Sequence, residues 1–297
     1  MTHSLRFGLF LGQAGHDWQS LQERFLLAEE LGYDHAWLVD HFMDTSGDLG
    51  KPCMESWTLL AALAARTSRI RLGVLVSSNT FRHPALLLKE AVTVDHISGG
   101  RLILGVGAGW HEPEHRMYGI PFPPPAERVS RLEEAVQVLD LLMRQERTTF
   151  HGRHYTLDDA PFEPKPVQQP RIPLLIAAHR PRMLRLAARY ADQWDTFPEV
   201  TGAATEGVRT GIEDQIRQFD TLCHEAGRDP ATVRRSTWTG GEPLHSEGAF
   251  LAYVNRLRPL GFTDFTTALP GPEHMPTVRR IATDILPALR AESRARD

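Results

Sequence analysis

The sequence is poor in cysteine and contains no block of basic residues. Its 297 residues include only two cysteines, Cys53 and Cys223, which lie far apart and form no CxxC pair. This usage fits a reducing compartment and argues against a disulfide framework or a zinc site. The formal net charge is −4 at pH 7, and no basic cluster offers the electrostatic footprint that nucleic acid requires. We therefore expect no nucleic-acid partner.

Long apolar runs are also missing. No run approaches the roughly 18 consecutive residues that a transmembrane helix needs. The first residues, MTHSLRFGLFLGQAGHDW, lack the basic and apolar regions of a secretory signal peptide. These features predict a cytoplasmic protein with no membrane partner.

Short apolar runs alternate with amphipathic stretches along most of the chain. Strands are expected at residues 5–11, 36–39, 71–76, 102–106, 174–177, 193–197, 233–238 and 262–269, and helices at 19–31, 55–66, 85–96, 126–144, 181–190, 211–226, 249–260 and 276–291. Such alternation implies parallel strands joined by right-handed crossovers. Eight pairs favour an α/β fold, a (β/α)8 TIM barrel, as a single domain over 1–297. An open doubly wound sheet is the alternative, although no GxGxxG follows the first strand.

The rhythm breaks between residues 147 and 173. A hairpin is expected around His151-Gly152, followed by the proline-rich segment PFEPKPVQQPRIP. We interpret this stretch as an insertion after the fourth helix, within one domain.

The segment RLILGVGAGW, residues 101–110, begins as a buried strand and then becomes rich in glycine. Gly105, Gly107 and Gly109 weaken a strand and have no side chain to pack. They suit a place where another backbone or a flat ligand comes close. Two interpretations remain open, namely the floor of a cofactor pocket and a tight strand-to-loop turn without a ligand. Trp110 suits either the wall of such a pocket or core packing.

Chemistry in a barrel of this type sits at the carboxyl ends of the strands. The residues that follow the expected strands are polar, glycine-rich and aromatic, without paired acids for glycoside hydrolysis and without a GxSxG elbow. This combination suits a planar, phosphorylated organic cofactor that performs most of the chemistry. The strongest polar pair is Asp40-His41, because an imidazole there can place a proton. A histidine bonded to a backbone carbonyl is the alternative.

Two further clusters follow strands. His179, Arg180 and Pro181 open an expected helix, where free N–H groups favour a phosphate; simple helix capping is the alternative. His111, Glu112, Glu114 and His115 resemble a metal cluster in composition, but Pro113 interrupts them. We expect these residues to form a solvated loop and expect no metal site.

Four segments resemble the bacterial luciferase-like monooxygenase superfamily. They are AWLVDHF at residues 36–42, TFRHPALLLKEAVTVDHISGGRLILGVGAGW at 80–110, HEPEHRMYGIPFPPPAERVSRLEEAVQVL at 111–139 and PLLIAAHRPRMLRLAARYADQWDTF at 173–197. They occur in order over most of the first 200 residues. The order of GVGAGW, the EPEH loop, IPFPP and a long helix is most similar to the branch that uses the deazaflavin coenzyme F420.

The resemblance implies a (β/α)8 barrel that binds F420, or alternatively FMN, at the carboxyl ends of the strands. It assigns His41 to catalysis beside the ring, with Asp40 next to it. The substrate role that we expect for Trp110 rests on its place after the glycines and not on the resemblance. The resemblance also implies a non-proline cis peptide near Leu75-Val76, behind the ring. The remaining expected cofactor contacts are Ser77, Gly107, Ala108 and Gly109 near the ring and Ala177, Ala178, His179 and Arg180 on the phosphate side.

The chain departs from the sugar-phosphate dehydrogenases of this superfamily. They carry a glutamate directly after the glycines, where this chain has Trp110, and a tryptophan shortly after the histidine, where it has Asp44. Their substrate arrangement is therefore not carried over. Many relatives also have a run of glycines where this chain has AAHRP.

The leading hypothesis is an oxidoreductase that moves a hydride between the deazaflavin and a small organic substrate. An FMN-dependent monooxygenase on the same scaffold is the second hypothesis, and a non-catalytic flavin or ligand binder is the third. By analogy with the superfamily, we expect a homodimer.

Overall fold

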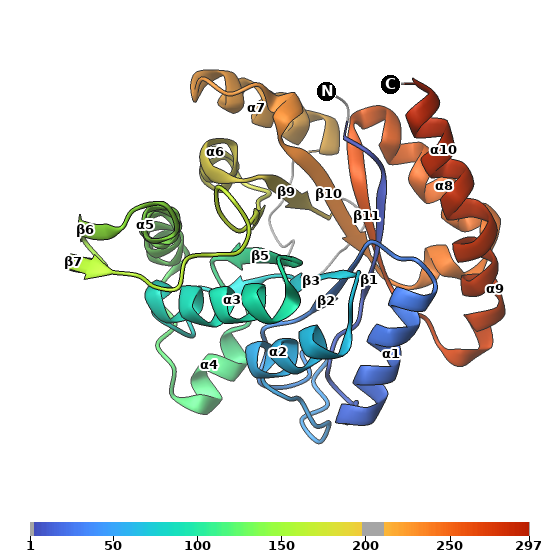
Figure 1. Cartoon of the computed structure of the whole chain (residues 1–297), viewed down its shortest axis with the longest axis horizontal. Helices are drawn as coiled ribbons and strands as arrows, with labels where there is room; N and C mark the ends of the chain where they lie inside the picture. Colours follow the sequence, from blue (N-terminus) through green and yellow to red (C-terminus); the bar gives the residue numbers. More distant parts are fainter. Residues whose placement is uncertain (1–2, 198–210, 297) are drawn as a thin grey trace. The chain divides into compact units, whose positions relative to one another are not determined.

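The computed structural model describes residues 3–197 and 211–296, and Figure 1 shows the order of its elements. The strands are β1 (Arg6–Phe10), β2 (His35–Leu38), β3 (Arg71–Val74), β4 (Ser77–Ser78), β5 (Leu102–Gly107), β6 (Arg147–His151), β7 (Thr156–Pro161), β8 (Leu174–Ala177), β9 (Gln193–Thr196), β10 (Arg234–Thr239) and β11 (Phe262–Ala268). The helices are α1 (Trp18–Glu30), α2 (Ser56–Arg66), α3 (Pro84–Ser98), α4 (Glu112–Tyr118), α5 (Pro125–Arg144), α6 (Pro181–Tyr190), α7 (Ile212–Glu225), α8 (Glu247–Leu257), α9 (Met275–Arg280) and α10 (Leu286–Arg296).

The main sheet has the strand order β3-β2-β1-β11-β10-β9-β8-β5-β4, and β3 also pairs with β5. The strand pairs whose register is defined in this sheet are all parallel. Parallel strands in this order, separated along the chain by helices, make the topology of a (β/α)8 barrel. The fold class expected from the sequence is therefore confirmed.

The chain divides into two compact units. Unit 1 comprises Met1–Gly12, Leu21–Trp37 and Ile176–Asp297, and unit 2 comprises Gln13–Ser20 and Leu38–Leu175. The expected single domain over 1–297 stays a prediction.

Unit 1 contains a parallel sheet built on β1, which pairs with β2 on one side and β11 on the other. Phe7 of β1 and Phe265 of β11 are neighbours in register and stack with their ring centroids 5.9 Å apart. Phe250 of α8 approaches Phe7 at 5.8 Å. All three rings are almost fully buried, so large aromatic side chains supply much of the apolar surface that this unit buries.

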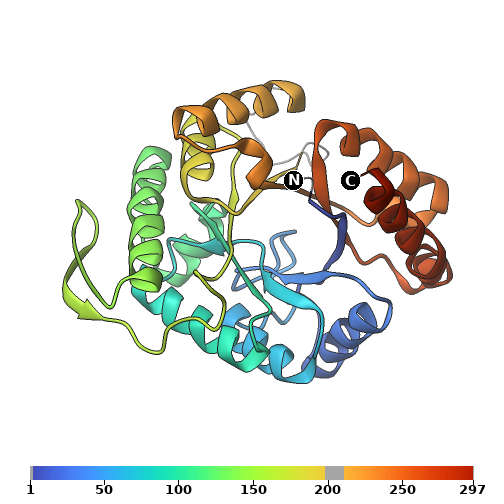
Figure 2. The same ribbon diagram turned by 45° about the horizontal axis from the view of Figure 1, so that its top comes forward.

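Unit 2 holds β3, β4 and β5 with the helices α2 to α5. Local sequence sets the helix ends: the carboxylate of Glu55 accepts hydrogen bonds from the amides of Trp57 and Thr58 at the start of α2. Pro84 occupies the first position of α3, where its missing N–H costs little. Helix α3 ends at Gly99, whose φ of 65° suits glycine. The β6–β7 hairpin extends beyond α5 (Figure 2).

A single arginine joins several element ends before β5. Arg101 donates hydrogen bonds to the carbonyl oxygens of Ala64, Thr67, Ile70 and Ser98 and to the hydroxyl of Thr67, at 2.8–2.9 Å. These acceptors lie at the carboxyl ends of α2 and α3 and before β3. One guanidinium therefore satisfies carbonyl groups that the helices leave without intrahelical partners.

The expected solvated loop around Pro113 is wrong. Residues Glu112–Tyr118 form α4, which begins after His111 and ends at Gly119 with a φ of 69°. Proline in the first turn of a helix removes an N–H that needs no intrahelical partner, so Pro113 is compatible with the start of a helix. Glu114 and His115 are fully buried.

Two further boundaries differ from expectation. The third strand ends at Val74 and is followed by a cis peptide bond at Leu75-Val76 and then by β4. The last expected helix is divided into α9, a π-helical turn at Ile281–Ile285 and α10.

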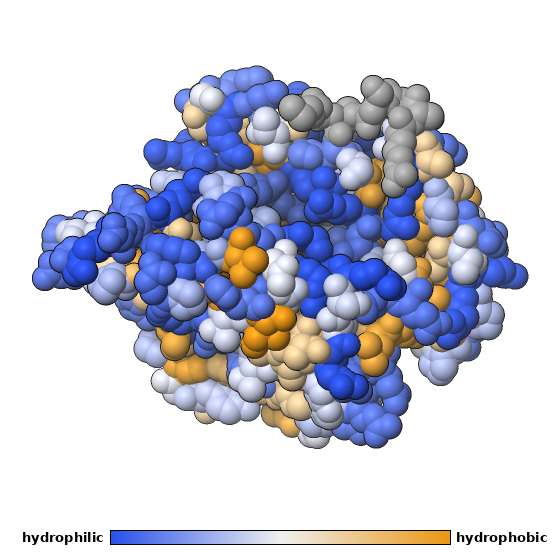
Figure 3. Space-filling model, in the orientation of Figure 1, coloured by the Kyte–Doolittle hydropathy of each residue, from blue (hydrophilic) through white to orange (hydrophobic). Residues whose placement is uncertain are grey.

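The surface is predominantly hydrophilic on the face drawn in Figure 3, with separate apolar spots. The large apolar side chains that are exposed in the described chain are Trp18, Leu49, Leu86, Ile97, Trp110, Met117, Tyr118 and Val167. Across residues 3–197 and 211–296, none of the helices has the length and hydropathy that crossing a membrane would take.

Candidate active site

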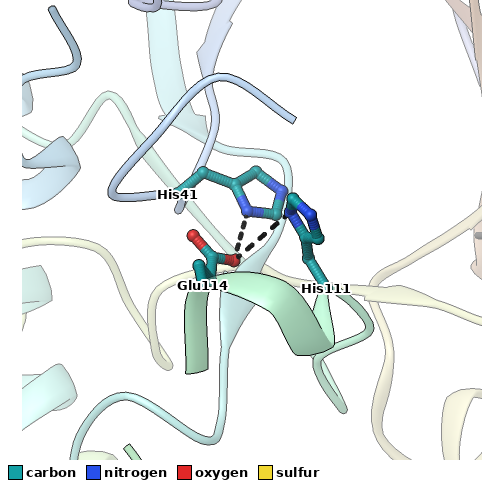
Figure 4. Close-up of side chains that lie close together, drawn as sticks. All are labelled: His41, His111 and Glu114. Carbon is teal, nitrogen blue, oxygen red and sulfur yellow. Dashed lines mark hydrogen bonds and ion pairs between the residues drawn. The ribbon is translucent and has the colours of Figure 1, made fainter. Parts of the chain in front are cut away.

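An imidazole and a carboxylate meet after β2 in unit 2. His41 follows that strand, and its Nδ1 lies 2.7 Å from Oε1 of Glu114 on α4 (Figure 4). The second oxygen of Glu114 accepts a hydrogen bond from the backbone amide of Phe42 at 3.0 Å. The Glu114 side chain is 1% exposed and that of His41 is 16% exposed. A carboxylate accepts hydrogen bonds only, so this contact fixes the His41 ring with its hydrogen on Nδ1.

Glu114 is held in its charged form. Burial acts to raise the pKa of Glu114, but the hydrogen bond and charge of His41, together with the Phe42 amide, outweigh burial and lower it. Helix α4 is itself anchored by aromatic contacts, because the ring of His115 stacks on Phe81 with centroids 4.8 Å apart. The position of the carboxylate therefore follows from packing of α4.

A second imidazole and an indole complete this cluster. Nδ1 of His111 lies 3.9 Å from Oε1 of Glu114, too far for a hydrogen bond. The Trp110 ring stacks on His111 with a centroid distance of 4.9 Å and meets His41 edge-on at 5.6 Å. Trp110 is 41% exposed, which excludes core packing as its role. Burial lowers the pKa of His111.

Asp40 has partners other than its neighbour His41. Its two oxygens accept hydrogen bonds from the guanidinium of Arg82 at 2.6 and 3.1 Å. They also accept from the hydroxyl of Ser56 and the amide of Ser78, both at 2.8 Å. Asp40 thus ties the end of β2 to α2 and β4. Its expected contact with a cofactor stays a prediction.

The glycines of β5 admit a neighbouring segment of this chain. A Cβ on Gly105 would lie 2.3 Å from the carbonyl oxygen of Val74, and one on Gly107 would lie 2.6 Å from Cγ2 of Val76. Real Cβ atoms do not approach so closely without a shift of their neighbours. The close approach of the Val74 backbone explains Gly105, and that of the Val76 side chain explains Gly107. The cis bond implied by the resemblance lies at Leu75-Val76 beside them.

The residues expected at the ring differ in exposure. Ser77 and Gly107 are buried, whereas five others in unit 2 keep partial exposure, namely His41, Leu75, Val76, Ala108 and Gly109. Gly109 has a φ of 82° and lies close to Ser78 and Thr80. A bound molecule can therefore touch His41, the segment after β3 and the end of β5.

The expected phosphate-side residues lie in unit 1, at the junction of β8 and α6. Ala177 ends β8, the carbonyl of Ala178 accepts from the indole of Trp194 at 2.9 Å, and Arg180 directly precedes α6. Nδ1 of His179 lies 2.9 Å from the hydroxyl of Thr196. Burial and the charge of Arg180 lower the pKa of His179 to about 4, so this ring is a neutral hydrogen-bonding group.

Sequence reasoning missed an aromatic cluster in unit 1. Trp238 of β10 stacks on Phe10 of β1 at 5.2 Å and approaches Phe197 at 5.6 Å, and Phe197 contacts the His179 ring at 3.9 Å. Each of these aromatic residues lies at or just before the carboxyl end of a strand or directly after it. That shared position was the signal available in the sequence. The role of Glu114 as the partner of His41 was also missed, because its helix was not recognised.

The family profile of the luciferase-like monooxygenases matches residues 2–239. The chain therefore belongs to the luciferase-like monooxygenase family, as the sequence motifs implied.

Several curated relatives have named activities. The chain is 36% identical over 198 residues to an F420-dependent glucose-6-phosphate dehydrogenase of Microbacterium testaceum, covering 66% of this chain and 57% of the relative. It is 38% identical over 223 residues to the protein of that name in Kineococcus radiotolerans, covering 71% and 65%. A third such relative, from Intrasporangium calvum, is 28% identical over 325 aligned positions, covering 92% and 95%. The chain thus spans less than two thirds of the first two relatives.

Solved structures share the fold. An F420-dependent secondary alcohol dehydrogenase in complex with an F420-acetone adduct superposes with a TM-score of 0.82 at 20% identity, covering 97% of this chain and 99% of that one. The coenzyme F420 dependent tetrahydromethanopterin reductase from Methanopyrus kandleri gives a TM-score of 0.78 at 17% identity, covering 97% and 100%. At these identities the likeness concerns the fold.

Proposed function

We propose that this protein is an oxidoreductase that uses coenzyme F420 and interconverts the hydroxyl and carbonyl forms of a small organic substrate. The observation that carries the proposal is the position of the His41 imidazole directly after β2, where the buried carboxylate of Glu114 fixes it. Relatives named F420-dependent glucose-6-phosphate dehydrogenase support the cofactor and the class of reaction. A relative from Mycobacterium kansasii named as a ketoreductase, 33% identical over 231 residues, supports the carbonyl chemistry.

The residues present fit such a cofactor. His41, Leu75, Val76, Ala108 and Gly109 keep partial exposure among buried neighbours, and most of these side chains are small or apolar, as a flat ring requires. They would hold the deazaflavin together with Ser77 and Gly107. When bound, the deazaflavin accepts or donates a hydride. The phosphate-side role of Ala177, Ala178, His179 and Arg180 stays a prediction.

The proton is handled by His41. Its Nδ1 is bound by Glu114, so exchange of a proton with the substrate falls to Nε2. During oxidation the substrate hydroxyl gives its proton to Nε2, and during reduction the same atom returns it. The negative charge of Glu114 stabilises the imidazolium that forms, as a buried carboxylate does for a catalytic histidine.

The substrate differs from glucose 6-phosphate in this proposal. Trp110 stands where the sugar-phosphate dehydrogenases carry glutamate, and Asp44 stands where they carry tryptophan. Asp44 forms an ion pair with Lys51 at 2.6 Å. We assign Trp110 to substrate contact, because its ring meets His41 and is partly exposed. An aromatic wall beside the proton-handling group favours an apolar substrate.

Titration of the purified full chain with F420 and with FMN tests the cofactor. We expect F420 to bind and to change its absorption spectrum, and reduced FMN to support no oxygen-dependent turnover. Tight binding of FMN without affinity for F420 would overturn the proposal in favour of a monooxygenase.

Replacement of His41 tests the catalytic role. His41→Ala should lower the turnover number by about 10²- to 10⁴-fold, the usual contribution of a general acid–base group, with little change in F420 affinity. His224→Ala is the matched control, because His224 is exposed on α7. Equal turnover in both variants would contradict the assignment. The expected homodimer also stays a prediction, which the molecular mass in solution checks.

A further inference from the structure

Two imidazoles and one carboxylate come together in unit 2. His41, His111 and Glu114 each offer one ligand atom, and these atoms all lie within 4.8 Å of one another (Figure 4). The sequence led us to expect no metal because cysteine is scarce and because residues 111–115 were interpreted as a loop. However, a set of two histidines and one glutamate needs no cysteine and is a frequent ligand set of zinc sites that keep an open position.

Two of the three ligand separations in this cluster lie on either side of the separation that a tetrahedral site requires, and the third is at most 4.8 Å. Zinc binds nitrogen and oxygen at about 2.0–2.2 Å, which places neighbouring ligand atoms about 3.3 Å apart. Oε1 of Glu114 lies 2.7 Å from Nδ1 of His41 and 3.9 Å from Nδ1 of His111. The required separation falls between these two distances. Shifts of about 0.6 Å in each ring position, well within side-chain motion, would bring both nitrogens to it.

Among residues 3–197 and 211–296, one ligand atom has no hydrogen-bond partner. Nδ1 of His111 is buried without one, and the residue is about nine-tenths buried. A buried polar atom without a partner destabilises the folded state. The ring cannot turn away easily, because Trp110 stacks on it at an interplanar angle of 13°. The nitrogen lies in the cluster next to the charged oxygen of Glu114, where a cation would satisfy it.

We propose that His41, His111 and Glu114 form a binding site for a divalent transition-metal cation such as Zn²⁺. The cation takes the place of the hydrogen on Nδ1 of His41 and contacts the carboxylate and His111. The partial exposure of His41 and Trp110 gives the cation access from solvent. As a consequence that rests on the proposed function, an occupied site competes with proton handling by His41, so the cation inhibits the reaction.

Titration of the full chain with Co²⁺, followed by its visible ligand-field absorption, tests the site without any cofactor or substrate. We expect one equivalent of Co²⁺ to bind with the intense bands of tetrahedral coordination and to be displaced by Zn²⁺. His111→Phe keeps the ring stack on Trp110 but removes the ligand, and it should weaken binding at least about tenfold. Circular dichroism checks its folding, with His111→Ala as a second variant.

Glu112→Gln is the matched control, because Glu112 is exposed on the same helix, and it should leave the Co²⁺ affinity unchanged. Octahedral spectra, or equal affinity of the wild type and both His111 variants, would overturn the proposal. Because this measurement needs no F420, loss of the proposed function leaves its result intact. Conversely, absence of Co²⁺ binding alongside F420-dependent turnover would overturn the metal site alone.

Discussion

Units 1 and 2 each place a half-buried histidine just after a strand, but the partners of the two rings differ. His41 of unit 2 is hydrogen-bonded to the buried, charged Glu114. His179 of unit 1 contacts the hydroxyl of Thr196 and the ring of Phe197. Burial lowers the pKa of His179 to about 4. Burial therefore keeps the His179 ring neutral at pH 7, whereas the ring of His41 has a charged partner at its Nδ1.

Buried acids follow the same contrast. Asp40 of unit 2 forms a two-point ion pair with Arg82, which is almost fully buried. Asp195 of unit 1 accepts a hydrogen bond from the hydroxyl of Ser236 at 2.6 Å. Burial, helped by the nearby charge of Asp264, raises the pKa of Asp195 to about 8. Asp40 is therefore paired with a cation, whereas Asp195 stays neutral at pH 7.

Removal of Arg82 should give the largest change in the stability of the protein. Arg82→Met leaves the buried carboxylate of Asp40 without its cation, and we expect a loss of about 3–5 kcal/mol in the free energy of unfolding. Chemical denaturation measures it. Adding Asp40→Asn should recover part of the loss, because the uncompensated charge disappears. A cost below about 1 kcal/mol for Arg82→Met would show that the ion pair is not what stabilises this region.

Neutralising the partner of His41 should have an intermediate effect. Glu114→Gln keeps the shape and an acceptor for the Phe42 amide but removes the charge that stabilises the imidazolium. We expect the turnover number to fall at least about tenfold with KM little changed, since an orienting carboxylate can contribute up to ~10⁴-fold. His179→Asn is the counterpart in unit 1. Its turnover number should stay within about threefold of the wild-type value, because that ring is already neutral. Similar losses in both variants would break the comparison.

The smallest effect is expected from Asp195→Asn, and it depends on pH. The pKa of Asp195 is about 8 in the folded protein, against 3.8 for an ordinary aspartate. Its contribution to stability is therefore complete below about pH 4 and is lost as the pH rises through about 8. The asparagine variant should lose less stability than the wild type between about pH 5 and pH 9. Denaturation at several pH values measures this, and parallel profiles would contradict a neutral Asp195.

Much of the fold was predictable because hydrophobic periodicity acts locally. The strand expected at residues 174–177 coincides with β8, and the helix expected at 181–190 coincides with α6. An apolar run marks the limits of the strand, and Pro181 marks the start of the helix. Helix α4 was not predictable by the same reasoning. Its seven residues are too few for a periodic signal, and Pro113 was interpreted as an interruption although it lies in the first turn.

The candidate site was predictable only in part. The choice of His41 as a candidate site residue follows directly from its place after an expected strand. Its partner Glu114 lies 73 positions further along the chain, and no local pattern links residues so distant. For the glycines of β5, the clustering was visible in the sequence but its cause was not. Whether a ligand or the chain itself requires them depends on the positions of Val74 and Val76, which only the structure gives.

The hydrogen bonds of Arg101 bear on how this protein can change over evolutionary time. This guanidinium joins helix ends at the start of β5, whereas Trp110 and His111 follow the other end of the same strand. With Trp110 in its proposed role at the substrate, we expect substitutions around it to alter substrate preference while the junction at Arg101 preserves the scaffold. A library randomised at the far end of β5 should therefore yield folded variants with new specificities far more often than one randomised around Arg101.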